Sequence, residues 1–100
     1  MDSVEARHII ASELNEYRAW SYDRLKALIG GPTKKNEVST QSGHQYYIGI
    51  RVYWDSKSNG NIRVIGSIDD GGWRAFIPVT DSFIKAPDGS FVGEDRTRSE

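Results

Sequence analysis

The stretch that decides the fold runs from Gln45 to Val79 and reads QYYIGIRVYWDSKSNGNIRVIGSIDDGGWRAFIPV. Apolar and polar residues alternate along most of it, and two glycine-containing segments interrupt the alternation. Because successive side chains of a β-strand point to opposite faces, a period of two indicates strands that bury one face. The stretch therefore predicts an antiparallel meander of three strands, over Gln45–Trp54, Asn61–Ile68 and Trp73–Thr80.

The loop between the first two strands determines which residues face each other. Its Asn59-Gly60 pair suggests a two-residue turn, but that turn would place an apolar face against a polar one. A shift of one residue turns a whole strand over, so only a loop with an odd number of residues keeps the apolar faces together. We therefore expect Trp54 opposite Val64 and Val52 opposite Gly66.

The second loop, Asp69-Asp70-Gly71-Gly72, needs an even number of residues for the same reason. Loops of two and four residues give the same strand pairs. They differ in which of these pairs exchange backbone hydrogen bonds and which do not. Pro78 has no N–H group to donate, and a four-residue loop directs this missing donor away from the second strand. We favour the four-residue loop, with these expected pairs: Ile68 with Trp73, Gly66 with Ala75, and Val64 with Ile77.

Residues 3–29, before the meander, are expected to form one long helix. Asp2 is a suitable N-cap, and Glu5 three positions later completes a capping-box spacing. Gly30-Gly31-Pro32 is a strong end signal, because glycine suits the left-handed cap and proline cannot continue a helix. The helix would bury a stripe that recurs every three or four residues. That stripe comprises Ile10, Leu14, Tyr17, Ser21, Leu25 and Leu28.

The remaining segments are polar or ambiguous. Thr33–Gly43 is predicted to be a connection, with a short strand near Glu37–Thr40. Asp81–Lys85 either extends the third strand past a bulge or forms a turn. Ser90–Gly93 is predicted to be a short final strand, and the polar residues 94–100 a disordered tail.

The expected architecture is a single α+β domain over residues 1–93. In it, the long N-terminal helix packs on the apolar face of a three- or four-stranded antiparallel sheet. The order of one helix followed by a meander is similar to a cystatin-like fold. This similarity concerns the topology alone and implies no function.

Composition narrows the possible partners and the compartment. The chain has 100 residues, the size of one domain, and a net charge of −1 with acids and bases interspersed. A nucleic-acid or membrane surface normally needs a basic patch, so we expect neither partner. The chain has no cysteine, and we find no secretory signal or membrane span in the sequence. We therefore expect a cytoplasmic protein.

The outer face of the predicted sheet is the strongest candidate for binding, because one helix covers only one face. Tyr and Arg are favoured at interface hot spots, and an exposed apolar patch with a polar rim marks an interaction site. The candidate interaction residues are Tyr47, Arg51, Tyr53, Ile65 and Phe76. The alternative is that the C-terminal segment folds back and covers this face with Phe83, Ile84, Phe91 and Val92.

A second candidate site lies at one end of the predicted sheet. In the expected register, His44 lies at the same end as Asp69, Asp70 and Arg74. A histidine beside carboxylates can act as a general acid or base, but we favour the simpler interpretation of a polar turn. Two histidines without cysteine form no persuasive zinc set, and no phosphate loop or serine nucleophile motif occurs. We therefore expect no metal and no cofactor.

The leading hypothesis is a small interaction domain without catalytic activity. It would act through the outer face, either as a homodimer or with a protein partner. The rival hypothesis is a small-molecule-binding protein or enzyme with a pocket between helix and sheet. A filled core is the simpler expectation there, and a cavity with His44 or Asp69 at its mouth would favour the rival. The rival pocket would be lined by Trp20, Tyr46, Trp54 and Trp73.

Overall fold

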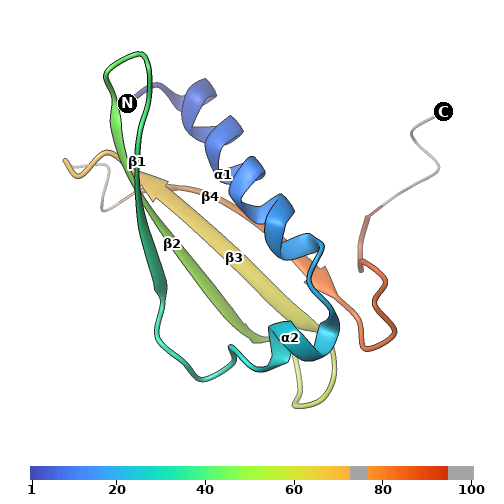
Figure 1. The fold of residues 1–100 in the computed structure, drawn as a ribbon. Helices are drawn as coiled ribbons and strands as arrows, with labels where there is room; N and C mark the ends of the chain where they lie inside the picture. Colours follow the sequence, from blue (N-terminus) through green and yellow to red (C-terminus); the bar gives the residue numbers. More distant parts are fainter. Residues whose placement is uncertain (73–76, 95–100) are drawn as a thin grey trace, which may run out of the picture.

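The computed structural model describes residues 1–72 and 77–94 of the chain and places them in two layers (Figure 1). One layer is an antiparallel sheet of order β1-β2-β3-β4, and the other consists of two helices. The α+β class and the antiparallel sheet are therefore confirmed. The elements are α1 (Ser3–Arg18), α2 (Tyr22–Lys26), β1 (Lys34–Ser39), β2 (Gln45–Trp54), β3 (Ile62–Asp69) and β4 (Val79–Lys85).

The N-terminal region forms two helices, so the prediction of one helix over residues 3–29 was wrong. The start was predicted correctly, because the Asp2 side chain accepts a hydrogen bond from the Glu5 N–H at 3.0 Å. The N-cap of the second helix is Ser21, whose backbone is extended and whose Oγ accepts from the Arg24 N–H at 3.1 Å. Serine inside a helical stripe can cap a new helix rather than continue the old one.

A buried lysine of β4 holds the end of α1. Lys85 is only 6% exposed, and its Nζ donates to the carbonyl oxygens of Arg18 and Trp20, each at 2.8 Å. The last carbonyls of a helix have no partner within it, and a cation is favoured beside them. Burial lowers the pKa of Lys85, and the nearby Arg18 charge lowers it further. A residue distant in sequence thus helps to determine where α1 ends.

The hairpin of β2 and β3 confirms the odd-numbered loop but not the expected pairs. Trp54 pairs with Ile62 rather than with Val64, and the whole register is displaced by two residues. The Asp55 N–H donates to the Asn61 carbonyl at 2.8 Å and closes a five-residue loop. Because a displacement of two residues keeps every side chain on its own face, the apolar faces still meet.

The third strand of the meander lies later in the chain than predicted. It is β4, whose first residue Val79 pairs with Ile68, so the expected pair of Ile68 with Trp73 was wrong, as were the two pairs derived from it. Residues 73–76 lie outside the described part of the chain. Asp81 and Lys85 occupy inward-facing positions of β4, and these two charges hide its alternation in the sequence.

The first strand, β1, makes the sheet four-stranded. It covers Lys34–Ser39 and pairs along its whole length with β2, where Val38 lies opposite Tyr46. The short strand expected near Glu37–Thr40 is therefore real, but it begins three residues earlier. Its polar composition, KKNEVS, suits a strand at the edge of a sheet.

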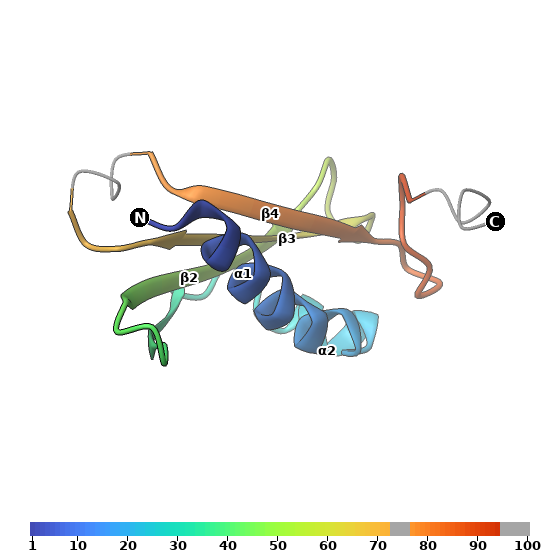
Figure 2. The same cartoon turned by 90° about the horizontal axis from the view of Figure 1, so that it is seen from above.

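Both helices lie on the same face of the sheet, α1 against β3 and β4 and α2 against β2 and β3 (Figure 2). The close approach depends on Gly66 of β3, where an added Cβ would lie 2.7 Å from Cδ1 of Ile10. No described helix has the length and apolar character needed to cross a membrane. The buried core comprises Ala6, Ile10, Leu14, Leu25, Tyr46, Ile48, Ile50, Ile62, Val64, Ile68 and Phe83.

Candidate functional site

The face of the sheet opposite the helices, called the outer face below, carries four of the five predicted interaction residues. Arg51 pairs with Ile65 across β2 and β3. Tyr47 and Tyr53 lie on the same face of β2 and are 40% and 37% exposed. The fifth residue, Phe76, lies outside the described residues.

The charges on the outer face balance one another. Arg63 contacts Asp55 with both Nε and Nη2, each 2.8 Å from the same carboxylate oxygen. On β1, Glu37 accepts a hydrogen bond from the Gln45 side chain at 3.0 Å. Strand register, together with the Arg63–Asp55 ion pair, places charges of both signs along this face. The bases are Lys35, Arg51 and Arg63, and the acids are Glu37, Asp55 and Asp69.

The C-terminal segment does not cover the outer face in the way the alternative predicted. Phe83 is 3% exposed and lies in the core on the helix side. Phe91 packs edge-to-face on it with a centroid separation of 5.8 Å, and the Arg18 guanidinium lies 5.0 Å from both rings. The alternative was therefore wrong for the two phenylalanines, because their side chains belong to the inner layer.

The described end of the chain forms a short arm beside β4. The Val92 N–H donates to the Ile84 carbonyl at 2.9 Å, and Phe91 forms a bridge with Lys85. A short final strand was predicted over Ser90–Gly93, but the structure has only this isolated bridge at Phe91. Glu94 ends the described residues with an ion pair to Arg18 at 2.7 Å, and the rest of the predicted tail lies outside them.

A shallow pocket of about 390 Å³ opens on the outer face near Gly49. Gly49 leaves its floor without a side chain, and Ser67 lies opposite it on β3. The Tyr47 ring forms part of the wall and lies against Gly71, where an added Cβ would come within 2.8 Å of it. Gly71 has a φ of +86°, so the turn and the tyrosine position both depend on glycine. The other lining residues are Thr33, Lys35, Ile48 and Asp69.

At one end of the sheet, a hydrogen-bond network surrounds the carboxylate of Glu5. His44 Nδ1 lies 2.7 Å from Glu5 Oε1, and the Tyr46 hydroxyl donates to the same oxygen at 2.8 Å. Ser42 Oγ donates to Glu5 Oε2 at 2.9 Å. These bonds, that of His44 foremost, hold the pKa of Glu5 at about 2. Burial, followed by the bond to Glu5, raises the pKa of Tyr46 to about 12.

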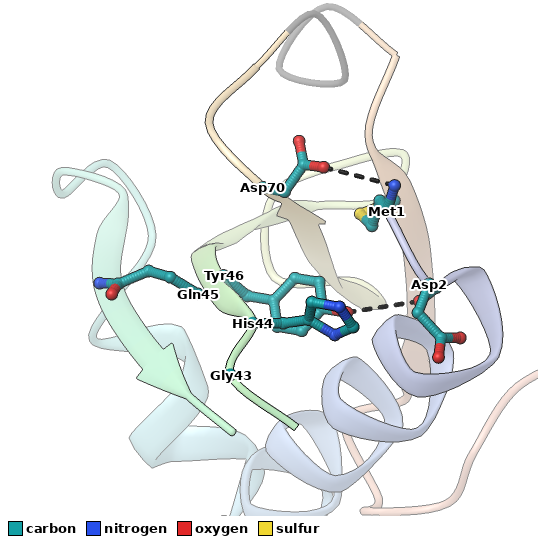
Figure 3. A pocket seen from close by; sticks show the side chains of 7 residues that line it. All are labelled: Met1, Asp2, Gly43, His44, Gln45, Tyr46 and Asp70. Atoms are coloured by element: carbon teal, nitrogen blue, oxygen red, sulfur yellow. Dashed lines mark hydrogen bonds and ion pairs between the residues drawn. The ribbon is translucent and has the colours of Figure 1, made fainter. Parts of the chain in front are cut away.

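His44 and Asp70 line the same open pocket of about 420 Å³ (Figure 3). The prediction that they share one end of the sheet was right, but the partner of His44 is Glu5, which was predicted only as part of the helix cap. Asp70 instead lies 3.5 Å from the α-amino group of Met1. Asp69 pairs with Tyr47 and lines the pocket on the outer face, while Arg74 lies outside the described residues.

This network lacks the arrangement that a hydrolytic triad requires. Ser42 Oγ lies 3.1 Å from His44 Nδ1, the same nitrogen that contacts Glu5. In a triad, the carboxylate and the nucleophile occupy opposite nitrogens of the imidazole. Among the described residues, no group of three His, Cys, Asp or Glu side chains is placed to hold a metal ion. The network ties the turn after β1 to the first turn of α1.

The aromatic residues of the rival pocket pack against the core. Tyr46 is fully buried, and Trp20 and Trp54 are partly buried against the core cluster. The Arg24 guanidinium stacks 3.6 Å from the centroid of the Trp20 ring. The fourth residue, Trp73, lies outside the described residues. The pocket that has His44 at its mouth lies at the end of the sheet, and of the three described aromatic residues only Tyr46 lines it.

No protein family, curated protein or solved structure matches this chain. The cystatin-like topology therefore stays a prediction.

Proposed function

We propose that this chain is a small protein-interaction domain without catalytic activity, and that its outer face is the contact surface. The observation that carries the proposal is the pair of exposed tyrosines, Tyr47 and Tyr53, with Arg51 and Ile65 on the same face. No described element forms a layer over them. Tyrosine and arginine contribute most of the affinity in many interfaces, because they combine large contact areas with hydrogen bonds.

The outer face is large enough for a specific interface. With strands of 6, 10, 8 and 7 residues, about 3.3 Å per residue and about 4.8 Å between strands, it covers about 500 Å² in projection. A standard interface buries about 800 Å² of accessible surface on each partner. Side-chain relief adds accessible surface to the projected area, so the two values are comparable.

Charge balance supports a second copy of the chain as the partner. In a two-fold symmetric dimer, the same patch of both subunits forms the contact. A face with charges of one sign would repel its own copy, whereas Lys35, Arg51 and Arg63 are matched by three acids on the same face. The chain has no cysteine, so such a dimer suits a reducing compartment, and a cytoplasmic location is part of this proposal.

Size-exclusion chromatography with light scattering at two concentrations tests this proposal. We expect the solution mass of the wild type to be at least twice the chain mass of 11.3 kDa. We expect Tyr53→Arg to lower this mass. Val4→Arg is the matched control, because Val4 is a 69% exposed apolar residue of α1, away from the outer face. A Tyr53→Arg mass equal to that of wild type would refute self-association through this face.

A further inference from the structure

The edge of the sheet formed by β1 has backbone groups that no strand among the described residues uses. Figure 1 shows β1 at the margin of the sheet, with β2 as its neighbour. The Thr40 N–H donates to the His44 carbonyl at 2.9 Å. Hydrogen-bonded pairs alternate along an antiparallel ladder, so Asn36 and Val38 also direct their backbone groups to β2. Lys35 and Glu37 therefore direct theirs to the free edge.

A second contact supports this assignment. The Glu37 N–H donates to the side chain of Asn36, the residue before it, at 3.1 Å. A backbone donor that faced β2 would bond to a β2 carbonyl instead. The residues on both sides of this bond are exposed, so the edge is accessible along the middle of β1.

We propose that β1 pairs with β1 of a second copy, antiparallel and with the two-fold axis at Asn36. Residues whose backbone groups point to the free edge must lie opposite residues of the other copy whose backbone groups also point to the free edge. Because such residues occupy every second position of β1, the two-fold axis must pass through a residue and not between two residues. An axis at Glu37 would place two carboxylates opposite each other, and an axis at Lys35 two ammonium groups. Like charges directly opposite each other destabilise a strand pair, and opposite charges stabilise it.

An axis at Asn36 places Lys35 of each copy opposite Glu37 of the other. It makes two opposite-charge pairs, and it aligns residues 34–38 of the two copies, which are five of the six residues of β1. An axis at Val38 or beyond would shorten the overlap and lose both charge pairs. Lysines on edge strands commonly oppose unwanted pairing. Here Lys35 would oppose the other registers and favour this one.

The pairing would join two four-stranded sheets into one of eight strands. The two outer faces would then lie on the same side of a continuous sheet, because two-fold pairing within a sheet preserves its faces. This contact uses the edge of β1, whereas the proposed function uses Tyr53 and its neighbours on β2 and β3. The edge pairing therefore does not depend on self-association through the outer face.

Single cysteines test the register directly, because the chain has none of its own. In the proposed pairing, the two copies of residue 36 form a non-hydrogen-bonded pair with Cα atoms about 4.5 Å apart. A disulfide accepts Cα separations of about 4.4–6.8 Å. We expect mild oxidation to convert Asn36→Cys into a covalent dimer with loss of the monomer band. Lys35→Cys and Glu37→Cys should stay largely monomeric. In this register, each of these residues lies two positions away from the same residue of the other copy.

Charge reversal provides the second test. Lys35→Glu or Glu37→Lys alone places like charges opposite each other and should reduce the Asn36→Cys crosslink. The double variant restores opposite charges and should restore the crosslink. If Asn36→Cys crosslinks no faster than the two control cysteines, the register is refuted. Failure of the double variant to recover would overturn the role of the charges.

Adding Tyr53→Arg to Asn36→Cys separates this inference from the proposed function. We expect the crosslink to persist, because Tyr53 is not part of the β1 edge. Loss of the crosslink in this variant would refute a separate edge contact. If the crosslink is absent while Tyr53→Arg still lowers the mass, the edge pairing fails and the outer-face proposal stands.

Discussion

Gly66 sits where α1 comes closest to the sheet, and its substitution by alanine tests the packing of the two layers. An added Cβ would lie 2.7 Å from Cδ1 of Ile10 and 3.2 Å from Cδ1 of Ile50. Both atoms belong to residues that are at most 2% exposed, so neither can move into solvent. Gly66→Ala must therefore displace a core side chain or push α1 outward.

The expected loss of stability follows from this overlap. Adding a methyl group to a filled core costs about 1–3 kcal/mol. In an open strand position, alanine would instead be neutral or favourable, because glycine loses more backbone entropy on folding. Gly49→Ala is the matched control, because an added Cβ at Gly49 meets only Ser67 Oγ at 3.3 Å and Thr33 Cγ2 at 3.4 Å. We expect Gly49→Ala to change stability by less than Gly66→Ala.

Urea denaturation gives the free energy of unfolding, and Ile10→Val provides the rescue. This change removes Cδ1, the atom nearest to the added Cβ, and alone costs about 0.5–1.5 kcal/mol. The double variant should lose less stability than the sum of the two single losses, because contacting residues couple. Equal stability of Gly66→Ala and wild type, or strictly additive losses, would refute the close approach of α1.

Three further predictions concern the ends of the helices and the Glu5 network. Lys85→Met leaves the carbonyls of Arg18 and Trp20, at the end of α1, without their donor and should cost about 1–3 kcal/mol in urea denaturation, whereas Lys57→Met at an exposed position should change little. Ser21→Ala removes the N-cap of α2 and should cost about 1 kcal/mol; an unchanged denaturation midpoint would contradict that role. The pKa of Glu5 is lowered to about 2 from 4.5, so its contribution to stability is present above pH 4.5 and is lost as the pH falls from 4.5 to 2. Thermal unfolding across this range should therefore show a smaller pH dependence for Glu5→Gln than for the control Glu16→Gln, and equal slopes would contradict the assignment.

The strands show what alternation can and cannot predict. The range of β2 was predicted correctly, because ten residues with a clear period of two leave little doubt about their faces. The register with β3 was wrong by two residues, since that displacement leaves every side chain on its own face. The connection after β3 was predicted too short, because the sequence WRAFIPV alternates in the same way as a strand.

The candidate site shows a similar limit. The sequence placed Tyr47, Arg51, Tyr53 and Ile65 together on one face, because their faces follow from alternation alone. It missed the contact of His44 with Glu5, which are 39 residues apart. Glu5 had a sufficient local explanation in the capping box, and nothing in the sequence near His44 pointed to α1.

The sequence by itself determined the class of each segment and the face of most strand residues. Those properties depend on neighbours two to four positions away, where sequence patterns are informative. Only the tertiary structure decided the end of α1, the register of the strands and the partners of Glu5. Each depends on contacts between distant segments, such as Lys85 with the carbonyls of Arg18 and Trp20. Such contacts exist only once the helix has packed on the sheet and excluded water.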